Sequence, residues 1–141
     1  MSQNNQSKPN HQVALDVAFM ERLLAEAKES PRLRVAYDLR TTPEDQSQRM
    51  LNAMLPGTQV PIHRHTTTTE VVTILYGRLT EIFFDEEGNE TERFLMDVEG
   101  PVRGISIPLY QWHTVEVTEP CVILEAKDGP YEPAKPENLK V

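Results

Sequence analysis

Three histidines and one glutamate have the residue types and spacing of a metal site. His63 and His65 are two residues apart in a segment predicted to be extended, so their imidazoles point to one face of a strand. Glu70 follows a run of four threonines, and a turn in that run would return its carboxylate to the pair. Imidazole and carboxylate groups together suit one divalent transition metal, and they leave the choice among Fe, Mn, Ni, Co and Zn open.

His113 is the third candidate imidazole ligand. Polar and apolar residues alternate after it, which places His113 on the same strand face as Val115 and Val117 and directs it to the interior. A buried histidine needs a hydrogen-bond or metal partner. Taken singly, a His-x-His pair is most often two surface side chains, and an inward histidine is more often a hydrogen-bonded core residue. Only the four residues together predict metal ligation by His63, His65, Glu70 and His113.

The segments that position these side chains begin with one helix. Asp16 is a favourable N-cap residue, and apolar residues recur behind it at helical spacing. Ser30 and Pro31 end this helix, and its apolar stripe predicts packing against the main body.

After residue 34 the pattern is that of short strands separated by turns rich in proline, glycine and acidic residues. The predicted strands are Val35–Leu39, Arg49–Leu55, Gln59–His65, Glu70–Tyr76, Leu79–Phe84, Arg93–Met96, Arg103–Ile107, His113–Val117 and Cys121–Lys127. This spacing is typical of an antiparallel sandwich or barrel. We expect a disordered tail over 1–12, one domain over 13–131 and an extended C-terminal tail over 132–141.

Composition narrows the class of protein. The chain has 141 residues, the size of one domain, and a formal net charge of −8. That charge argues against binding to nucleic acid or to an anionic membrane surface. Cys121 is the only cysteine, so no internal disulfide can form. No signal-peptide or membrane-spanning pattern is evident, and we expect a cytoplasmic protein.

The segment from Gly57 to Gly77 resembles the first cupin motif, G-x5-H-x-H-x4-E-x6-G, and meets each of its fixed positions. The second motif, G-x5-P-x-G-x2-H-x3-N, is matched only in part. Its proline and histidine are Pro108 and His113, but Tyr110 stands at the usual glycine and Val117 at the usual asparagine. These departures leave the ligand in place and affect the turn before it.

Across roughly residues 16–133 the chain is similar to the WbuC-family cupin-fold metalloproteins of bacteria, some of which are encoded with O-antigen and lipopolysaccharide genes. Segments that carry the resemblance include Pro-Ile-His-Arg-His at 61–65, Ile-Pro-Leu-Tyr-Gln-Trp-His-Thr-Val at 107–115 and Lys-Asp-Gly-Pro-Tyr at 127–131. The resemblance implies an all-β, single-domain cupin jelly-roll β-barrel with a short N-terminal helix. It also implies one divalent metal per chain and a homodimer.

Two classes of function fit these residues. One is an enzyme, either a metal-dependent isomerase or a non-haem dioxygenase, acting on a small sugar-like or hydroxy/keto molecule. Tyr76 and Tyr110 are weak catalytic candidates, and no second carboxylate or lysine stands out as a general base. The alternative is a non-catalytic, metal-dependent module that binds or senses a small ligand.

Overall fold

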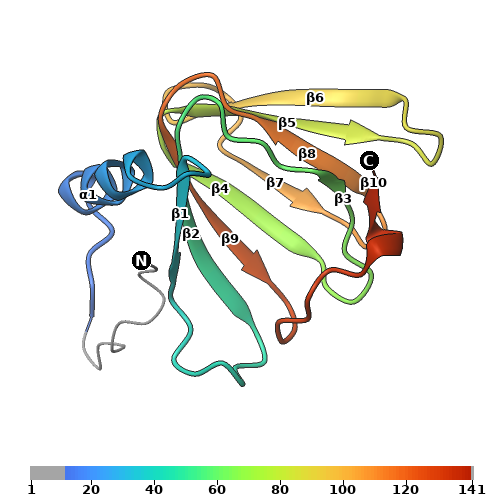
Figure 1. Ribbon diagram of the computed structural model, residues 1–141, viewed down its shortest axis with the longest axis horizontal. Coiled ribbons are helices and arrows are strands. Elements are labelled where there is room, and N and C mark those ends of the chain that lie inside the picture. Colours follow the sequence, from blue (N-terminus) through green and yellow to red (C-terminus); the bar gives the residue numbers. More distant parts are fainter. Residues whose placement is uncertain (1–11, 141) are drawn as a thin grey trace.

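The computed structural model describes residues 12–140, which form two antiparallel five-stranded sheets and one α-helix (Figure 1). The first sheet contains, in spatial order, β1 (Arg34–Asp38), β2 (Gln48–Met54), β9 (Cys121–Lys127), β4 (Glu70–Tyr76) and β7 (Gly104–Ile107). The second contains β10 (Leu139–Lys140), β3 (Ile62–His63), β8 (Trp112–Glu116), β5 (Arg78–Phe84) and β6 (Glu90–Asp97). The histidine-bearing strand β3 therefore pairs with strands from distant parts of the chain.

Alternating inward side chains from both sheets form the main core. Buried members come from β2, β4, β5, β6, β7 and β9 and from the residue after β8 (Trp112–Glu116). They are Met54, Val72, Ile74, Leu79, Phe83, Met96, Ile107, Val117, Cys121 and Ile123. Residues at every second position of a strand share a face, so each strand gives one apolar row to the space between the sheets. This packing fixes the two sheets against each other.

Helix α1 (Val17–Lys28) covers the outer face of the first sheet (Figure 1). Asp16 caps it by accepting a hydrogen bond from the Phe19 N–H at 2.9 Å. Its buried side chains pack against Leu51, Ala53 and Val122, which point outward from β2 and β9. The helix thus forms a second apolar layer, separate from the space between the sheets.

The predicted helix and the sequence of short strands agree with the structure, with shifts of one to three residues at most ends. The segment 59–65 differs, because only Ile62–His63 is strand. Among residues 12–140 no strand pairs across the two sheets, so the fold is a double-sheet arrangement and a closed barrel is not formed by backbone pairing.

The C-terminal segment is more ordered than the extended tail expected over 132–141. It contains a 3-10 turn, Pro136–Asn138, and the strand β10, which pairs with β3. Almost all of the tail expected over 1–12 lies outside the described residues. Within the part of the chain that is described, no helix has the length and apolar character to cross a membrane.

Candidate metal centre

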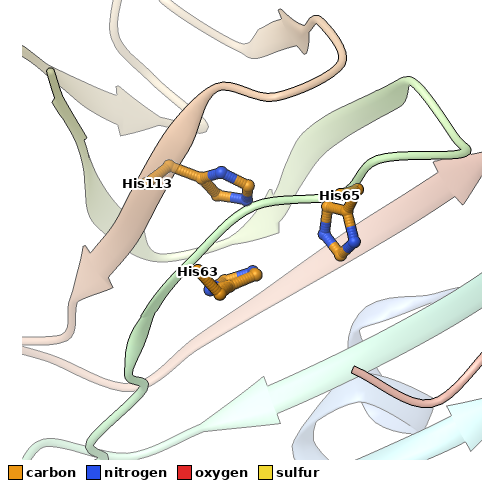
Figure 2. A group of neighbouring side chains, drawn as sticks. All are labelled: His63, His65 and His113. Atoms are coloured by element: carbon orange, nitrogen blue, oxygen red, sulfur yellow. The ribbon is translucent and has the colours of Figure 1, made fainter. Parts of the chain in front are cut away.

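The sheet pairing brings three histidines together. His63 in β3 and His113 in β8 are directly opposite each other in the antiparallel ladder, and His65 follows β3 by two residues. One ring nitrogen from each of the three lies within 4.8 Å of the others. Figure 2 shows the three rings close together, with His113 on one strand and His63 and His65 on a separate segment of the chain. This grouping is compatible with a shared cation.

Backbone carbonyls orient two of the rings. The Nδ1 atom of His63 lies 2.9 Å from the Pro61 carbonyl oxygen, and Nδ1 of His113 lies 2.8 Å from that of Gln111. A carbonyl only accepts, so Nδ1 carries the proton in both rings and Nε2 keeps its lone pair. Holding the outer nitrogen in this way is how proteins prepare an imidazole to bind a metal.

Glu70, the first residue of β4, adds a carboxylate from the other sheet. Its Oε1 atom is 3.4 Å from His65 Nε2 and 3.6 Å from His113 Nε2. Both Glu70 Oε1 and His65 Nε2 are buried without a hydrogen-bond partner. Buried polar atoms are almost always satisfied, so these two orphaned atoms fit a cation held between them. The donor set therefore suits the metal that the sequence predicts.

The charge states of these groups favour the same conclusion. Burial, reinforced by the nearby His113, lowers the pKa of His63 to about 4, so this imidazole is neutral at pH 7. Burial would raise the pKa of Glu70, but interactions with His113 and His65 outweigh it and hold that pKa well below its usual value. At neutral pH the site offers a neutral imidazole and an ionised carboxylate.

Two further carboxyl groups, which sequence reasoning missed, lie on the inner faces near Glu70. Glu125 in β9 accepts a hydrogen bond from the Asn52 side-chain amide, and burial together with the charge of Glu70 raises its pKa to about 8. Glu81 in β5 is buried, and burial and the charges of Glu70 and Glu125 raise its pKa well above the usual value. The sequence does contain a sign that these glutamates point inward. Each of them stands two positions from an apolar core residue of the same strand.

Tyr76 lies away from the histidines. The pairing between β4 and β9 shifts register between Ile74 and Tyr76, so Tyr76 pairs with Val122 and joins the cluster beneath helix α1. Its hydroxyl donates a hydrogen bond to Glu21 in that helix at 3.1 Å. Strand parity placed Tyr76 on the face of Glu70, and the β-bulge turns it to the opposite face.

Tyr110 supports the site through its backbone. Its N–H donates to the His65 carbonyl at 2.8 Å, while its side chain is 56% exposed. Its φ of 67° lies in the left-handed region that glycine adopts most easily. This explains why the cupin motif has glycine at this position, and it shows that the tyrosine keeps the turn of the motif.

Arg64 lies between His63 and His65 in the sequence and connects the site to the C-terminal segment. Its guanidinium lies over the Trp112 ring at 4.6 Å, and its Nε donates to Asn138 Oδ1 at 2.9 Å. Lys140 in β10 also lies over the Trp112 ring, at 4.3 Å, and the indole N–H donates to Glu86 at 3.2 Å. These contacts anchor β10 beside β3 and hold the wall next to the histidines.

A cavity of about 320 Å³ opens beside His63 and His65. Its other walls come from the start of β1, the start of β2, the end of β9, and the C-terminal residues 130–135 and 138–139. The volume lies in the range of small-molecule sites. Two of the three histidines, His63 and His65, therefore line a cavity of this size.

Comparison with solved structures identifies the fold. The capsular polysaccharide assembling protein CapF from Staphylococcus aureus matches with a TM-score of 0.57 and 22% identity, over 75% of this chain and 29% of that one. CapF with the inhibitor 3-isopropenyl-tropolone gives a TM-score of 0.61, 21% identity, and coverage of 75% and 31%. The chain thus spans about a third of CapF. At these identities the likeness shows the fold alone.

Two other structures agree with this assignment. Oxalate decarboxylase from Lactobacillus farciminis, in a formate complex, matches with a TM-score of 0.54 and 18% identity over 70% of this chain and 29% of that one. The conserved SPY1581 protein of unknown function from Streptococcus pyogenes has a TM-score of 0.58 and 15% identity, over 92% of this chain and all of that one. The first match covers only part of the oxalate decarboxylase, whereas the second covers the whole SPY1581 chain.

Comparison with known sequences identifies a family for this chain. No curated protein sequence matches the chain. Residues 15–96, more than half of the chain, match the family described as Domain of unknown function (DUF6016). The matched region contains His63, His65 and Glu70 but ends before His113. The chain is therefore a member of the DUF6016 family, and its fold is that of the cupins.

Proposed function

We propose that this protein binds one divalent transition metal through His63, His65, His113 and Glu70, and uses it to hold and transform a small polar molecule. The observation that carries the proposal is the pair of orphaned buried atoms, His65 Nε2 and Glu70 Oε1, which lie 3.4 Å apart at the histidine cluster. A sugar-like or hydroxy/keto compound has adjacent oxygens that fit such a site. When bound, a divalent cation supplies Lewis-acid polarisation of a ligand oxygen.

The residues around the cluster supply what an isomerase needs besides the metal. The Pro61 and Gln111 carbonyls fix two imidazoles, so little reorganisation is required on binding. The Glu125 carboxyl, with its pKa raised to about 8, holds a proton at neutral pH beside an ionised Glu70. Carboxyl groups tuned to different pKa values are the usual components of proton transfer. A non-haem dioxygenase is the redox version of the same proposal.

The alternative is a non-catalytic module that binds or senses a small ligand through the metal. The placement of the two tyrosines favours it: Tyr76 contacts helix α1, and the Tyr110 side chain is exposed. A catalytic role for Tyr76 or Tyr110 stays a weak prediction of the sequence.

The cellular setting is a further part of the proposal. The resemblance to WbuC-family proteins suggests a cytoplasmic homodimer in bacterial polysaccharide metabolism. Exposed apolar residues such as Val71 and Leu95 are consistent with a second copy covering part of a sheet. Light scattering of the purified protein measures this, and a monomer at all concentrations would contradict the dimer.

Elemental analysis of untagged protein tests metal binding. We expect about one transition-metal ion per chain in the wild type, and loss of that ion in the double variant His63→Ala/His113→Ala. The variant His11→Ala is the matched control, because it removes the fourth histidine and leaves the cluster intact. Absence of metal from the wild type after reloading, or retention in the double variant, would contradict the proposal.

The variant Glu70→Gln separates the enzyme from the binding module. Metal-loaded wild type and variant are assayed for turnover with a panel of sugars, keto-acids and diols, and for thermal stability. An enzyme loses turnover while its fold remains. A wild type that binds members of the panel without converting any of them is a binding module.

A further inference from the structure

We propose that the cavity beside the histidines is an anion-binding subsite, in which Arg34 and Lys127 hold a carboxylate or phosphate group of the ligand. This inference rests on the proposed function, since it names the class of molecule that the metal centre would receive. The ligand would carry its anionic group on one wall of the cavity and a hydroxyl or carbonyl oxygen on the side of the histidines.

The charge of the cavity is opposite to that of the protein. The described residues that line it include four basic side chains and a single acidic one, Glu132. The four basic residues are Arg34, Arg64, Lys127 and Lys135. The chain as a whole has a net charge of −8. A basic cavity in an acidic protein concentrates anions locally and attracts them from solution.

Arg34 is a donor without an acceptor. It lies on the inner face of β1, opposite Met54, and its Nε atom is buried with no hydrogen-bond partner. Burial and the charge of Arg32 lower the pKa of Arg34, and the charge of Glu125 offsets only part of this lowering. A buried unsatisfied donor is costly, and a ligand oxygen accepting from this atom would remove the cost.

Lys127 supplies the second positive charge. It ends β9, where its neighbours across the ladder are Gln48 on one side and Glu70 on the other. Its charge lowers the pKa of Glu70, yet among residues 12–140 it forms no ion pair within 4.0 Å. Its ammonium thus remains available to a ligand on the cavity side of the metal ligands.

Gln48 shapes the wall between these cations. Its side-chain amide donates to the carbonyl oxygens of Gly129 at 3.2 Å and Pro130 at 3.1 Å. These bonds fix the start of the C-terminal segment, which turns across the cavity and continues to β10. The C-terminal segment therefore forms one hydrogen-bonded wall of the cavity.

The test compares matched charged and neutral ligands. Titration calorimetry is run on metal-loaded and metal-free protein with glycolate against ethylene glycol, and with glucose 6-phosphate against glucose. In the preferred pair, we expect the anion to bind at least about tenfold more tightly than its neutral partner, because one charge-assisted hydrogen bond provides that much affinity. Preference for glycolate assigns a carboxylate, and preference for glucose 6-phosphate assigns a phosphate. Equal binding of anionic and neutral partners would overturn the inference.

Variants assign the effect to the two cations. Arg34→Met and Lys127→Met should each weaken binding of the preferred anion about tenfold or more, with metal content and circular dichroism unchanged. Arg34→Lys keeps the charge and should restore part of the affinity. Arg103→Met is the matched control, because Arg103 is exposed and does not line the cavity. Anion affinity unchanged in both methionine variants would contradict the assignment.

Failure of this inference is distinguishable from failure of the proposed function. A wild type that holds metal but does not prefer anions contradicts only the subsite. A wild type that holds no metal but binds an anion through Arg34 contradicts only the metal centre.

Discussion

The space between the two sheets has an apolar end and a polar end, and the same strands run through both. Along β9 the inward side chains change from Cys121 and Ile123 to Glu125 and Lys127. Along β4 they change in the opposite chain direction, from Glu70 to Val72 and Ile74, because the strands are antiparallel. One end holds the sheets together, while the other buries charge around the histidines.

The two ends differ in how burial of their side chains changes the free energy of folding. Burial of apolar side chains stabilises the fold, whereas burial of carboxyl groups costs stability unless they are paired or protonated. The polar end contains several such groups, and their pKa values are shifted in both directions. A site that retains costly groups inside an otherwise stable sandwich is typical of binding or catalysis.

The largest effect is expected at the apolar end. Leu79 is 1% exposed, and Leu79→Ala should reduce the free energy of unfolding by about 3 kcal/mol through lost burial and a residual cavity. Denaturant unfolding measures the loss, and elemental analysis should show unchanged metal content. Loss of metal together with stability would show that the two ends are not independent.

A smaller effect, a gain of stability, is expected on substitution of Glu81, two residues after Leu79 in β5. The raised pKa of Glu81 means that the folded state keeps this proton to higher pH than the unfolded state does. Its contribution to stability is therefore fully present below the ordinary glutamate pKa and is lost as pH rises through the raised value. Glu81→Gln removes this loss.

Metal-free Glu81→Gln should consequently gain stability relative to the wild type as pH increases from 5 to 8. Urea unfolding of both proteins from pH 5 to pH 8 measures the difference. A constant difference across that range would show that Glu81 titrates at its ordinary pKa.

A further effect on stability is expected at helix α1, which lies outside the space between the two sheets. Asp16→Ala removes the acceptor for the Phe19 N–H and should cost about 1 kcal/mol. Asp16→Ser keeps an N-cap oxygen and serves as the control. Thermal unfolding should separate the two variants, and their metal content should be the same as that of the wild type.

The smallest effect is expected at the turn before His113. Tyr110→Gly relieves the left-handed backbone conformation at φ 67° and should stabilise the protein by about 0.5–1 kcal/mol. Calorimetric melting detects this gain, and Tyr110→Phe should show none. A loss of stability on glycine substitution would mean that the exposed ring contributes more than the backbone strain costs.

The grouping of the three histidines could be predicted because it depends on local rules. A two-residue spacing places His63 and His65 on one face, and alternation after His113 directs that ring inward. The helix followed from the Asp16 cap and an apolar stripe that agrees with its buried residues. The strands followed from turn residues at regular intervals, with errors mainly at their ends.

The remaining features depend on contacts that single-sequence rules do not contain. A β-bulge reverses the parity of Tyr76: β4 has one extra residue between Ile74 and Tyr76, which only the register against β9 reveals. Glu81 and Glu125 are important only because a sheet pairing and a sheet packing bring them near Glu70. The strand β10 forms because β3 provides an edge for it, which no pattern within residues 139–140 indicates.

The position of Trp112 provides the protein with its own optical reporter. It is the only tryptophan in the chain, it precedes His113, and Arg64 and Lys140 both lie over its ring. Indole emission is sensitive to nearby charge and is quenched by paramagnetic ions. Occupation of the histidine cluster, or displacement of the C-terminal strand, should therefore change the intrinsic fluorescence of the unlabelled protein, and a rapid-mixing experiment could follow either event in real time.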